Sequence, residues 1–374
     1  MANASKISIV VNGKSMSGWD SVEISRDMDN ISGTFAMSHK DLNADNLPMG
    51  ASCKVIIGSG IDFTMLTGYI DEIESSIGTA NVSWQLKGRD RTGDLVDCSY
   101  LTRSSDPNYP NELTNLRLID IMRKLTRRFG VNVNSDSSAD AIANTITDFT
   151  VNEGDTVADS VGRLCKLNAI MAISIGDGNL TLTRATNQSY GESLYLGSNI
   201  ISGQLAMSNL ERFQYYVLKG TRKTEDPFEL SQSFQMQAST IDSTIQRHRP
   251  LIMTDSHIND PEEAIQKVMW ERSLRAGKSR KYSCVVDGWL QKTNYPWFIN
   301  QLVKVNDKPR GLDGDTMLVQ KTRFTLTNEG GQKTYLDLVD PETYKLIRAT
   351  ESKGTQNKKF DAASVAAQIQ VTGE

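Results

Sequence analysis

Alternating apolar and polar residues fill the first hundred positions of the chain. Six short runs carry this pattern, at 6–11, 20–25, 32–38, 54–58, 63–73 and 81–87. Glycines punctuate the runs, at 13, 58, 60 and 78. A period of two gives each strand one apolar face, and that face must pack against another sheet. We therefore predict that residues 1–98 form a small antiparallel β-barrel or sandwich.

The apolar period then changes to that of a helix. Apolar residues recur at helical spacing before a glycine cap, at Leu118, Ile121, Met122, Leu125 and Phe129. A second helix is predicted to start after Asp155-Thr156, with its apolar stripe from Val157 to Cys165. The turn at 177–179 predicts a strand hairpin. Residues 99–185 are thus expected to form an α/β domain.

The strand period returns beyond residue 191. The predicted strands lie at 198–208, 213–219, 280–289, 302–305, 317–326 and 333–339. Residues 186–223 and 280–345 together are expected to form a second β-barrel.

A polar segment interrupts this second strand-rich region. Residues 224–259 are rich in Gln and Ser, and a helix is predicted from an Asp260 cap through Pro261 to about Ala276, ending at Gly277. We expect an inserted domain over 224–279 with this one helix. The C-terminal tail, 346–374, is expected to stay extended until something binds it.

The two strand-rich regions repeat one layout. Leu66 and Leu86 are 20 residues apart, and so are Leu318 and Leu338, within strands of similar order. Duplication of a β unit explains this spacing. The predicted fold class is therefore α+β and mainly β, with two similar small antiparallel β-barrels, an α/β domain and a mixed insertion.

Composition narrows the possible functions. Of 374 residues 38% are hydrophobic and 23% charged, which indicates a folded protein with several domains. The net charge of −4 provides no positive field for sequence-independent nucleic-acid binding. No apolar run approaches the roughly 20 residues of a membrane span, and the N-terminus is typical of a strand rather than a signal peptide. We expect no membrane insertion and folding in a cytoplasm.

Cysteine and histidine offer little chemistry. The four cysteines, at 53, 98, 165 and 284, are widely spaced and are predicted to be buried reduced thiols. Only three histidines occur, at 39, 248 and 257. Motifs for phosphate loops, metalloproteases and nucleophile elbows are missing. We therefore predict no catalytic, cofactor-binding or metal-binding residues, and no cofactor.

Two acidic motifs allow more than one interpretation. The run GRDRTGDLVD at 88–97 is either a catalytic carboxylate cluster or, as we favour from its place after a strand, a turn with ion pairs. Asp313-Gly314-Asp315 is either a calcium ligand set or a hairpin loop. The absence of the twelve-position calcium loop favours the hairpin.

The basic and aromatic clusters also allow more than one interpretation. A basic cluster ends the first predicted helix, at Arg123, Lys124, Arg127 and Arg128, and is explained by nucleic-acid or lipid binding or by helix-dipole compensation. Trp289, Trp297 and Phe298 either stack on sugars or lie in the core or at subunit contacts, which we favour. Trp270 is predicted on a packed surface helix.

Several phrases, taken in order, resemble the baseplate hub proteins of contractile phage tails, above all those of Mu-like phages. The most recognisable stretch is LTGYIDEIES followed by LKGRDRTGDLVDCS, and the C-terminal half is matched by phrases that include MWERSLRAGKSRKYSCVVDGW and PWFINQLVKVND. The resemblance covers residues 6–347. It extends more distantly to the T-even phage hub and to the N-terminal hub part of VgrG spikes.

The resemblance implies a structural, non-enzymatic protein of the virion tail, assembled in the host cytoplasm. It implies a homotrimeric ring in which three chains present six similar barrels. The implied partners are the tail tube or distal tail protein, the central spike and the baseplate wedge proteins, with DNA passing through without specific binding. A tail-associated enzyme that degrades peptidoglycan remains the alternative, because folding can assemble a carboxylate pair from distant residues.

Overall fold

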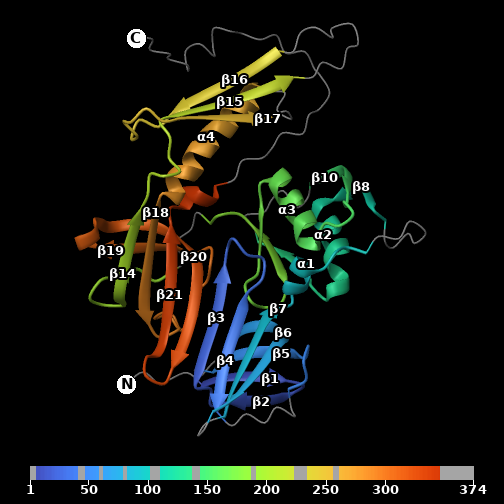
Figure 1. Cartoon of the computed structure of the whole chain (residues 1–374), viewed down its shortest axis with the longest axis vertical. Helices are drawn as coiled ribbons and strands as arrows, with labels where there is room; N and C mark the ends of the chain where they lie inside the picture. Colours follow the sequence, from blue (N-terminus) through green and yellow to red (C-terminus); the bar gives the residue numbers. More distant parts are fainter. Residues whose placement is uncertain are drawn as a thin grey trace. The chain divides into compact units, whose positions relative to one another are not determined.

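The computed structural model describes residues 6–40, 47–58, 62–78, 82–101, 110–136, 144–186, 191–222, 234–255 and 261–345 (Figure 1). The chain divides into two compact units. The first comprises Met1–Met207 and Arg280–Tyr344, and the second comprises Ser208–Ser279 with the chain from Lys345 onward. The predicted tail at 346–374 lies outside the described residues.

A single 13-stranded sheet dominates the first unit. Its N-terminal strands are β1 (Lys6–Val11), β2 (Lys14–Ser17), β3 (Ser21–Asp27), β4 (Thr34–Lys40), β5 (Ser52–Gly58), β6 (Asp62–Ile77) and β7 (Val82–Asp90). Its C-terminal strands are β13 (Leu194–Tyr195), β14 (Ile200–Met207), β18 (Arg280–Asp287), β19 (Leu302–Asp307), β20 (Leu312–Thr327) and β21 (Gly331–Val339). The mainly β, α+β class is confirmed.

Alternation predicted these strands well. All six N-terminal runs contain strands. Most of these strands bury every second residue, as in β1, where buried residues alternate with exposed or half-buried ones. Among the described strands of this sheet, the prediction missed β2, whose four residues are exposed or half-buried and carry no apolar alternation, and β13, which has only two residues. Burial against a partner face therefore supplied the sequence signal.

The strand order repeats across the sheet. Neighbours run β3-β4-β7-β6-β5-β1 in the N-terminal region and β14-β18-β21-β20-β19-β13 in the C-terminal region. Chain order matches strand for strand, although β1 pairs antiparallel with β5 whereas β13 pairs parallel with β19. Both regions thus have one connectivity, as duplication predicts.

Bulges fix the correspondence between the two regions. Each 16-residue strand, β6 and β20, carries one extra residue against its hairpin partner, Asp71 and Gln320 respectively. Two residues after the bulge, Ile73 faces Leu86 and Thr322 faces Leu336. Leu86 therefore corresponds to Leu336, two positions from the Leu338 that spacing alone suggested.

The two β regions are not separate barrels. Strand β3 pairs antiparallel with β20 from Ser21↔Thr327 to Asp27↔Lys321, so one sheet runs through both regions. Pairing among the described strands does not return from β2 to β14, and no closed barrel is formed by it. A shared core explains the continuity, because residues such as Ile24 and Phe324 belong to one buried cluster.

An α/β region packs its own core within the first unit. It contains α1 (Gly93–Asp97), β8 (Glu112–Arg117), α2 (Leu118–Thr126), η2 (Arg127–Phe129), β9 (Val133–Ser135), β10 (Thr145–Thr150), α3 (Val157–Asn168), β11 (Met171–Ile173) and β12 (Leu180–Thr183). Both predicted helices are confirmed. Gly130 is left-handed after the first, and a reciprocal capping box of Thr156 and Asp159 starts the second.

The second unit corrects the predicted insertion. It pairs β15 (Tyr215–Arg222) with β16 (Phe234–Ile241) and β17 (Pro250–Asp255), next to α4 (Pro261–Lys278). The strand predicted at 213–219 therefore belongs here rather than to the second β region, because its hydrogen bonds go to β16 and β17. Helix α4 also continues through Gly277, which does not end it. The predicted Asp260 cap lies outside the described residues.

The structure also tests the predictions for the cysteines and for a membrane span. Cys53, Cys165 and Cys284 are buried free thiols as predicted, but Cys98 is exposed because it follows the short helix α1 at the surface. Within the described residues, no helix is long and apolar enough to cross a membrane.

Candidate functional site

One face of the large sheet is polar across its central strands. Alternate side chains on β3, β6, β7, β18, β20 and β21 point away from the core, and we call their charged members the polar face: Glu23, Asp27, Glu72, Glu74, Lys87, Lys281, Lys321, Arg323 and Asp337. An open groove of about 800 Å³ follows part of this face across both β regions. The polar face is therefore a broad surface rather than a pocket.

Carboxylates hold the cations of the polar face. Lys87 bridges two glutamates at 3.2 and 3.1 Å, Glu72 and Glu74. Lys281 pairs with Asp337 at 2.9 Å. Across the β3–β20 junction, Lys321 lies 3.7 Å from Asp27 and Arg323 lies 3.7 Å from Glu23. Opposite charges thus alternate along the face instead of forming a basic patch.

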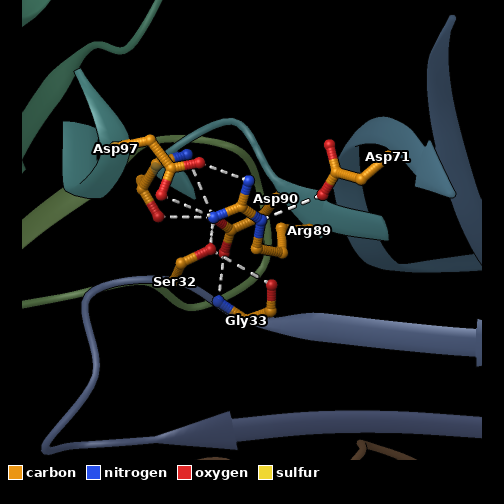
Figure 2. Close-up of polar contacts among 7 residues, drawn as sticks. Ser32, Gly33, Asp71, Arg89, Asp90 and Asp97 are labelled. Atoms are coloured by element: carbon orange, nitrogen blue, oxygen red, sulfur yellow. Dashed lines mark hydrogen bonds and ion pairs between the residues drawn. The ribbon is translucent and has the colours of Figure 1, made fainter. Parts of the chain in front are cut away.

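The acidic run at 88–97 folds into a buried anchor built on Asp90 (Figure 2). The Asp90 carboxylate, 1% exposed, accepts hydrogen bonds from the backbone of Gly33 and from Ser32, with Thr92 and Ser174 completing the set. These donors come from the β3–β4 turn, from the turn after β7 and from the α/β region. Asp90 therefore ties three segments together.

A second, more exposed cluster surrounds Arg89 (Figure 2). Its guanidinium donates to Asp71 at 2.9 Å and to both oxygens of Asp97 at 3.0 and 2.6 Å. The hydrogen bonds from Arg89 lower the pKa of Asp97, whereas burial and the neighbouring Asp71 raise the pKa of Asp94. The carboxylates of Asp90, Asp71 and Asp97 are occupied by donors, so the run forms the predicted turn with ion pairs.

Arg26 completes the anchor beneath Asp90. Burial lowers the pKa of its guanidinium to about 10, and the charges of Asp90 and Asp177 oppose that shift. Its side chain donates to the Met65 carbonyl, and a Cβ at Gly176 would collide with that carbonyl and with the guanidinium. Gly176 is thus required where the α/β hairpin approaches the sheet.

Sequence reasoning missed the partners of Asp90. Ser32, Gly33 and Ser174 lie 58, 57 and 84 positions away along the chain. Only the β4–β7 register, with Thr34 opposite Arg89, brings the first two beside it. No local pattern marks such a long-range set.

The remaining candidates take structural positions. The hairpin loop predicted at 313–315 is wrong, because these residues lie within β20, where left-handed Gly314 is the extra residue of a bulge against β19 and the β19–β20 turn comes earlier, at 308–311. Asp313 donates its backbone N–H to the Asp315 carboxylate, which pairs with Arg280 at 2.9 Å. Trp289 and Trp297 are 1% and 2% exposed, so they lie in the core and offer no sugar platform. Among the described residues, no group of three His, Cys, Asp or Glu side chains is placed to hold a metal.

The basic cluster and Trp270 lie on helices. Arg123 pairs with Asp120 at 3.8 Å on α2, and Arg127 and Arg128 are exposed on η2. Half-buried Trp270 on α4 donates its indole N–H to the Lys345 carbonyl at 2.7 Å, consistent with a packed surface helix.

Comparisons with known proteins give the class to which this repeated β architecture belongs. Three family models match in order along the chain. They describe the N-terminal domain of the Mu phage baseplate assembly protein GpP-like family (residues 6–90), the second domain of the baseplate hub protein gp44-like family (92–184) and the fourth domain of the Mu phage baseplate assembly protein GpP family (260–347). This class is that of phage tail baseplate proteins.

Individual relatives agree with the family models. The baseplate hub protein gp44 of Escherichia phage Mu is 25% identical over 95% of this chain and 94% of its own length. The 43 kDa tail protein of prophage MuSo2 from Shewanella oneidensis is 28% identical, with a TM-score of 0.78 over 91% of this chain and 99% of that one. The chain is therefore similar to Mu-type baseplate hub proteins along most of its length.

A more distant structure shares the fold. The E. coli c3393 protein, a component of the type VI secretion system, has a TM-score of 0.55 at 10% identity, over 89% of this chain and 76% of that one. The hub fold thus extends beyond phage tails.

Proposed function

We propose that this chain is the central hub of a contractile tail, a homotrimeric ring that joins the tail tube or distal tail protein to the central spike. The observation that carries the proposal is the strand order repeated within one sheet. Because each chain presents two equivalent β regions, three chains present six. Such a ring matches a sixfold tube on one side and a threefold spike on the other.

The polar face would line the channel of this ring. DNA must pass without being held, and phosphate is captured by cations that are free to release counterions. Lys87, Lys281 and Lys321 each have a carboxylate partner, which reduces their attraction for phosphate. The alternating charges of the polar face are therefore suited to transit of DNA rather than to binding.

The other domains would serve the remaining contacts. We assign the α/β region, predicted at 99–185, and the second unit to contacts with the baseplate wedge proteins. The tail at 346–374 would order on the spike or on a neighbouring subunit. Deletion of the tail is expected to abolish capture of the spike protein in a pull-down. An unrelated tagged protein with a deletion of equal size measures nonspecific capture. Full capture by the truncated chain would refute that role.

Mass measurement tests the ring most directly. Native mass spectrometry and sedimentation of the purified chain are expected to give a species of three chains at micromolar concentration. Class averages of that species in the electron microscope are expected to show a ring with a central hole. A stable monomer over the same concentrations would contradict the proposal.

The alternative as a peptidoglycan-degrading enzyme has its own test. Purified chain in a peptidoglycan zymogram is expected to leave the gel intact. Clearing by the parent chain that disappears in a carboxylate variant would favour the enzyme over the structural hub. Asp94→Asn is the variant of choice, because the pKa of Asp94 is raised and a general acid needs a raised pKa.

A further inference from the structure

The junction between the two β regions shows how one region joins the next. The edge of β20 has two parts: its first half pairs with β19, and its outer half, residues 321–327, pairs with β3. In that outer half, Phe324 lies opposite Ile24 and Leu326 lies opposite Val22. Buried side chains therefore cross this junction, and the pairing covers an edge that would otherwise be open.

Strand β6 has the same two-part edge with its outer half uncovered. Its first half pairs with β5, from Asp62↔Gly58 to Tyr69↔Ser52. Beyond the bulge at Asp71, residues 72–77 pair with β7 and with no other described strand. Ile77 occupies the position of Leu326 and is 84% exposed. An apolar side chain on an open strand edge is a template for pairing with another chain.

Strand β14 supplies the matching edge. It holds the place of β3 in the repeated order, and its only strand partner in the described chain is β18. Apart from an isolated bridge at Ile200, its outer edge is open. Ile201 and Met207 are 51% and 73% exposed. Among the described strands, the outer half of β6 and the outer edge of β14 are therefore two different edges without a strand partner.

We propose that the outer edge of β6 in one copy pairs antiparallel with the outer edge of β14 in the next copy, in the register of the β3–β20 junction. The pairing rests on the proposed ring and names the contact that closes it. When the two β regions are aligned by their strand pairings, Gln204 in β14 is equivalent to Glu23 in β3, and Leu205 is equivalent to Ile24. The predicted pairs between copies are Ile73 with Met207, Ser75 with Leu205, Ser76 with Gln204 and Ile77 with Gly203.

Side-chain chemistry favours this pair of edges. On the core side, Leu205 and Met207 would cover Ile73 and Ile77, which lie on the same face of β6. On the polar side, Gln204 and Ala206 place no charge beside Glu72 and Glu74. Pairing two β6 edges would instead bring these glutamates together, and like charges across strands are destabilising. Unlike edges therefore pair head to tail, which is the geometry that builds rings.

Cysteine pairs test the register. Ser76→Cys with Gln204→Cys puts two thiols on directly opposite residues, at about 4.5–5.5 Å between Cα atoms, within disulfide reach. The background is Cys98→Ser, since Cys98 is exposed. Ser76→Cys with Ser283→Cys is the matched control, because Ser283 pairs with Gln204 one strand further away. That added strand spacing of about 4.8 Å puts the control out of disulfide reach.

The expected result is a ladder of crosslinked dimer and trimer under mild oxidation, several-fold above the control. A trimer by native mass without this ladder would overturn the pairing and leave the proposed function standing. A monomeric parent chain would instead overturn the proposed function.

Charge insertion gives a second test that does not depend on disulfide formation. Ile77→Asp and Met207→Asp each place a carboxylate at an exposed position, so the single chain is expected to fold unchanged by circular dichroism. Each is expected to weaken self-association about tenfold or more. Met49→Asp, at a residue 60% exposed and outside both edges, is the control and is expected to leave association unchanged. Normal association of both edge variants would contradict the proposal.

Discussion

The outer halves of β20 and β6 occupy equivalent places in two copies of one connectivity, yet their side chains differ. In β20, Phe324 is fully buried and packs against Trp289 with ring centroids 5.7 Å apart. The position of Phe324 in β6 is held by Ser75, which is exposed. A junction formed within a chain, where the partner is always present, carries a permanent core. The edge that we propose to pair between copies carries an exposed serine and an exposed isoleucine instead.

The largest difference between the two outer halves is expected from truncation of Phe324. Phe324→Ala removes a fully buried ring and leaves a cavity, so the free energy of unfolding should fall by about 3–5 kcal/mol. Ser75→Ala at the equivalent position should change it by about 0.5 kcal/mol or less. Urea unfolding of the two variants measures both. Equal decreases in the free energy of unfolding would mean that Phe324 and Ser75 contribute equally to the packing of the two strands.

The turns that follow β7 and β21 extend the comparison. Asp90 and Asp340 each accept a hydrogen bond from the backbone N–H two residues later, Thr92 and Glu342. Asp90 is buried and ties in Ser174, whereas Asp340 is half-buried. The same local turn has thus become an anchor for the α/β region only once.

Alanine substitutions separate the two turns. Asp90→Ala leaves buried donors without an acceptor, at about 1–3 kcal/mol each, so we expect a loss near 3 kcal/mol. Asp340→Ala should cost about 1 kcal/mol or less, because water can replace the carboxylate. Thermal and urea unfolding of both variants provide the measurement. A small loss for Asp90→Ala would show that the buried network contributes little.

Local pattern predicted the strands of both regions but not their junction. Val22 and Ile24 alternate with polar residues, which determines that β3 is a strand with one buried face. The same alternation fits any neighbour, so it could not show that β20, nearly 300 positions away, lies beside it. Separate barrels were therefore expected where one sheet exists.

For the cluster around Asp90 and Arg89, too, the sequence predicted the local turn but not the partners from other elements. Asp90 and Arg89 stand out in the run at 88–97, and their position after a strand suggested a turn with ion pairs. Their partners Ser32, Ser174 and Asp71 come from other elements, and only the tertiary register brings them together. The short strands β8, β9 and β10 were missed because none carries a full alternating run.

Charge neutralisation on the polar face should show a smaller contrast. Arg323 pairs with Glu23 across the junction and lies 4.1 Å over the Tyr335 ring, so Arg323→Met should cost about 1 kcal/mol. Lys87 holds only exposed glutamates, so Lys87→Met should cost less than Arg323→Met. Urea unfolding at low and high salt distinguishes them, since salt screens the lysine contribution more fully.

The smallest effect concerns the pH dependence of the junction itself. Where β20 ends beside the start of β3, the Asn328 amide donates to the Asp20 carboxylate at 3.1 Å and lowers the pKa of Asp20 below its ordinary value of 3.8. A carboxyl whose pKa is lowered on folding adds stability that is complete above its unfolded pKa and is lost as the pH falls through its folded pKa. Stability measured by urea unfolding between pH 5 and pH 2 should therefore fall less steeply in Asn328→Ala than in the parent chain.

The control for this experiment uses the uncovered edge. Gly78 follows β6 at the position that Thr327 holds at the end of β20. Among the described residues, no strand equivalent to β3 lies beside 72–77, so this edge has no counterpart of the Asp20 carboxylate. Glu74→Gln, on that edge, should leave the slope of stability against pH near that of the parent, because its partner Lys87 keeps Glu72. If Glu74→Gln flattened the acid slope as much as Asn328→Ala, the acid sensitivity would not arise from the closed junction, and the distinction between covered and open edges would not extend to their electrostatics.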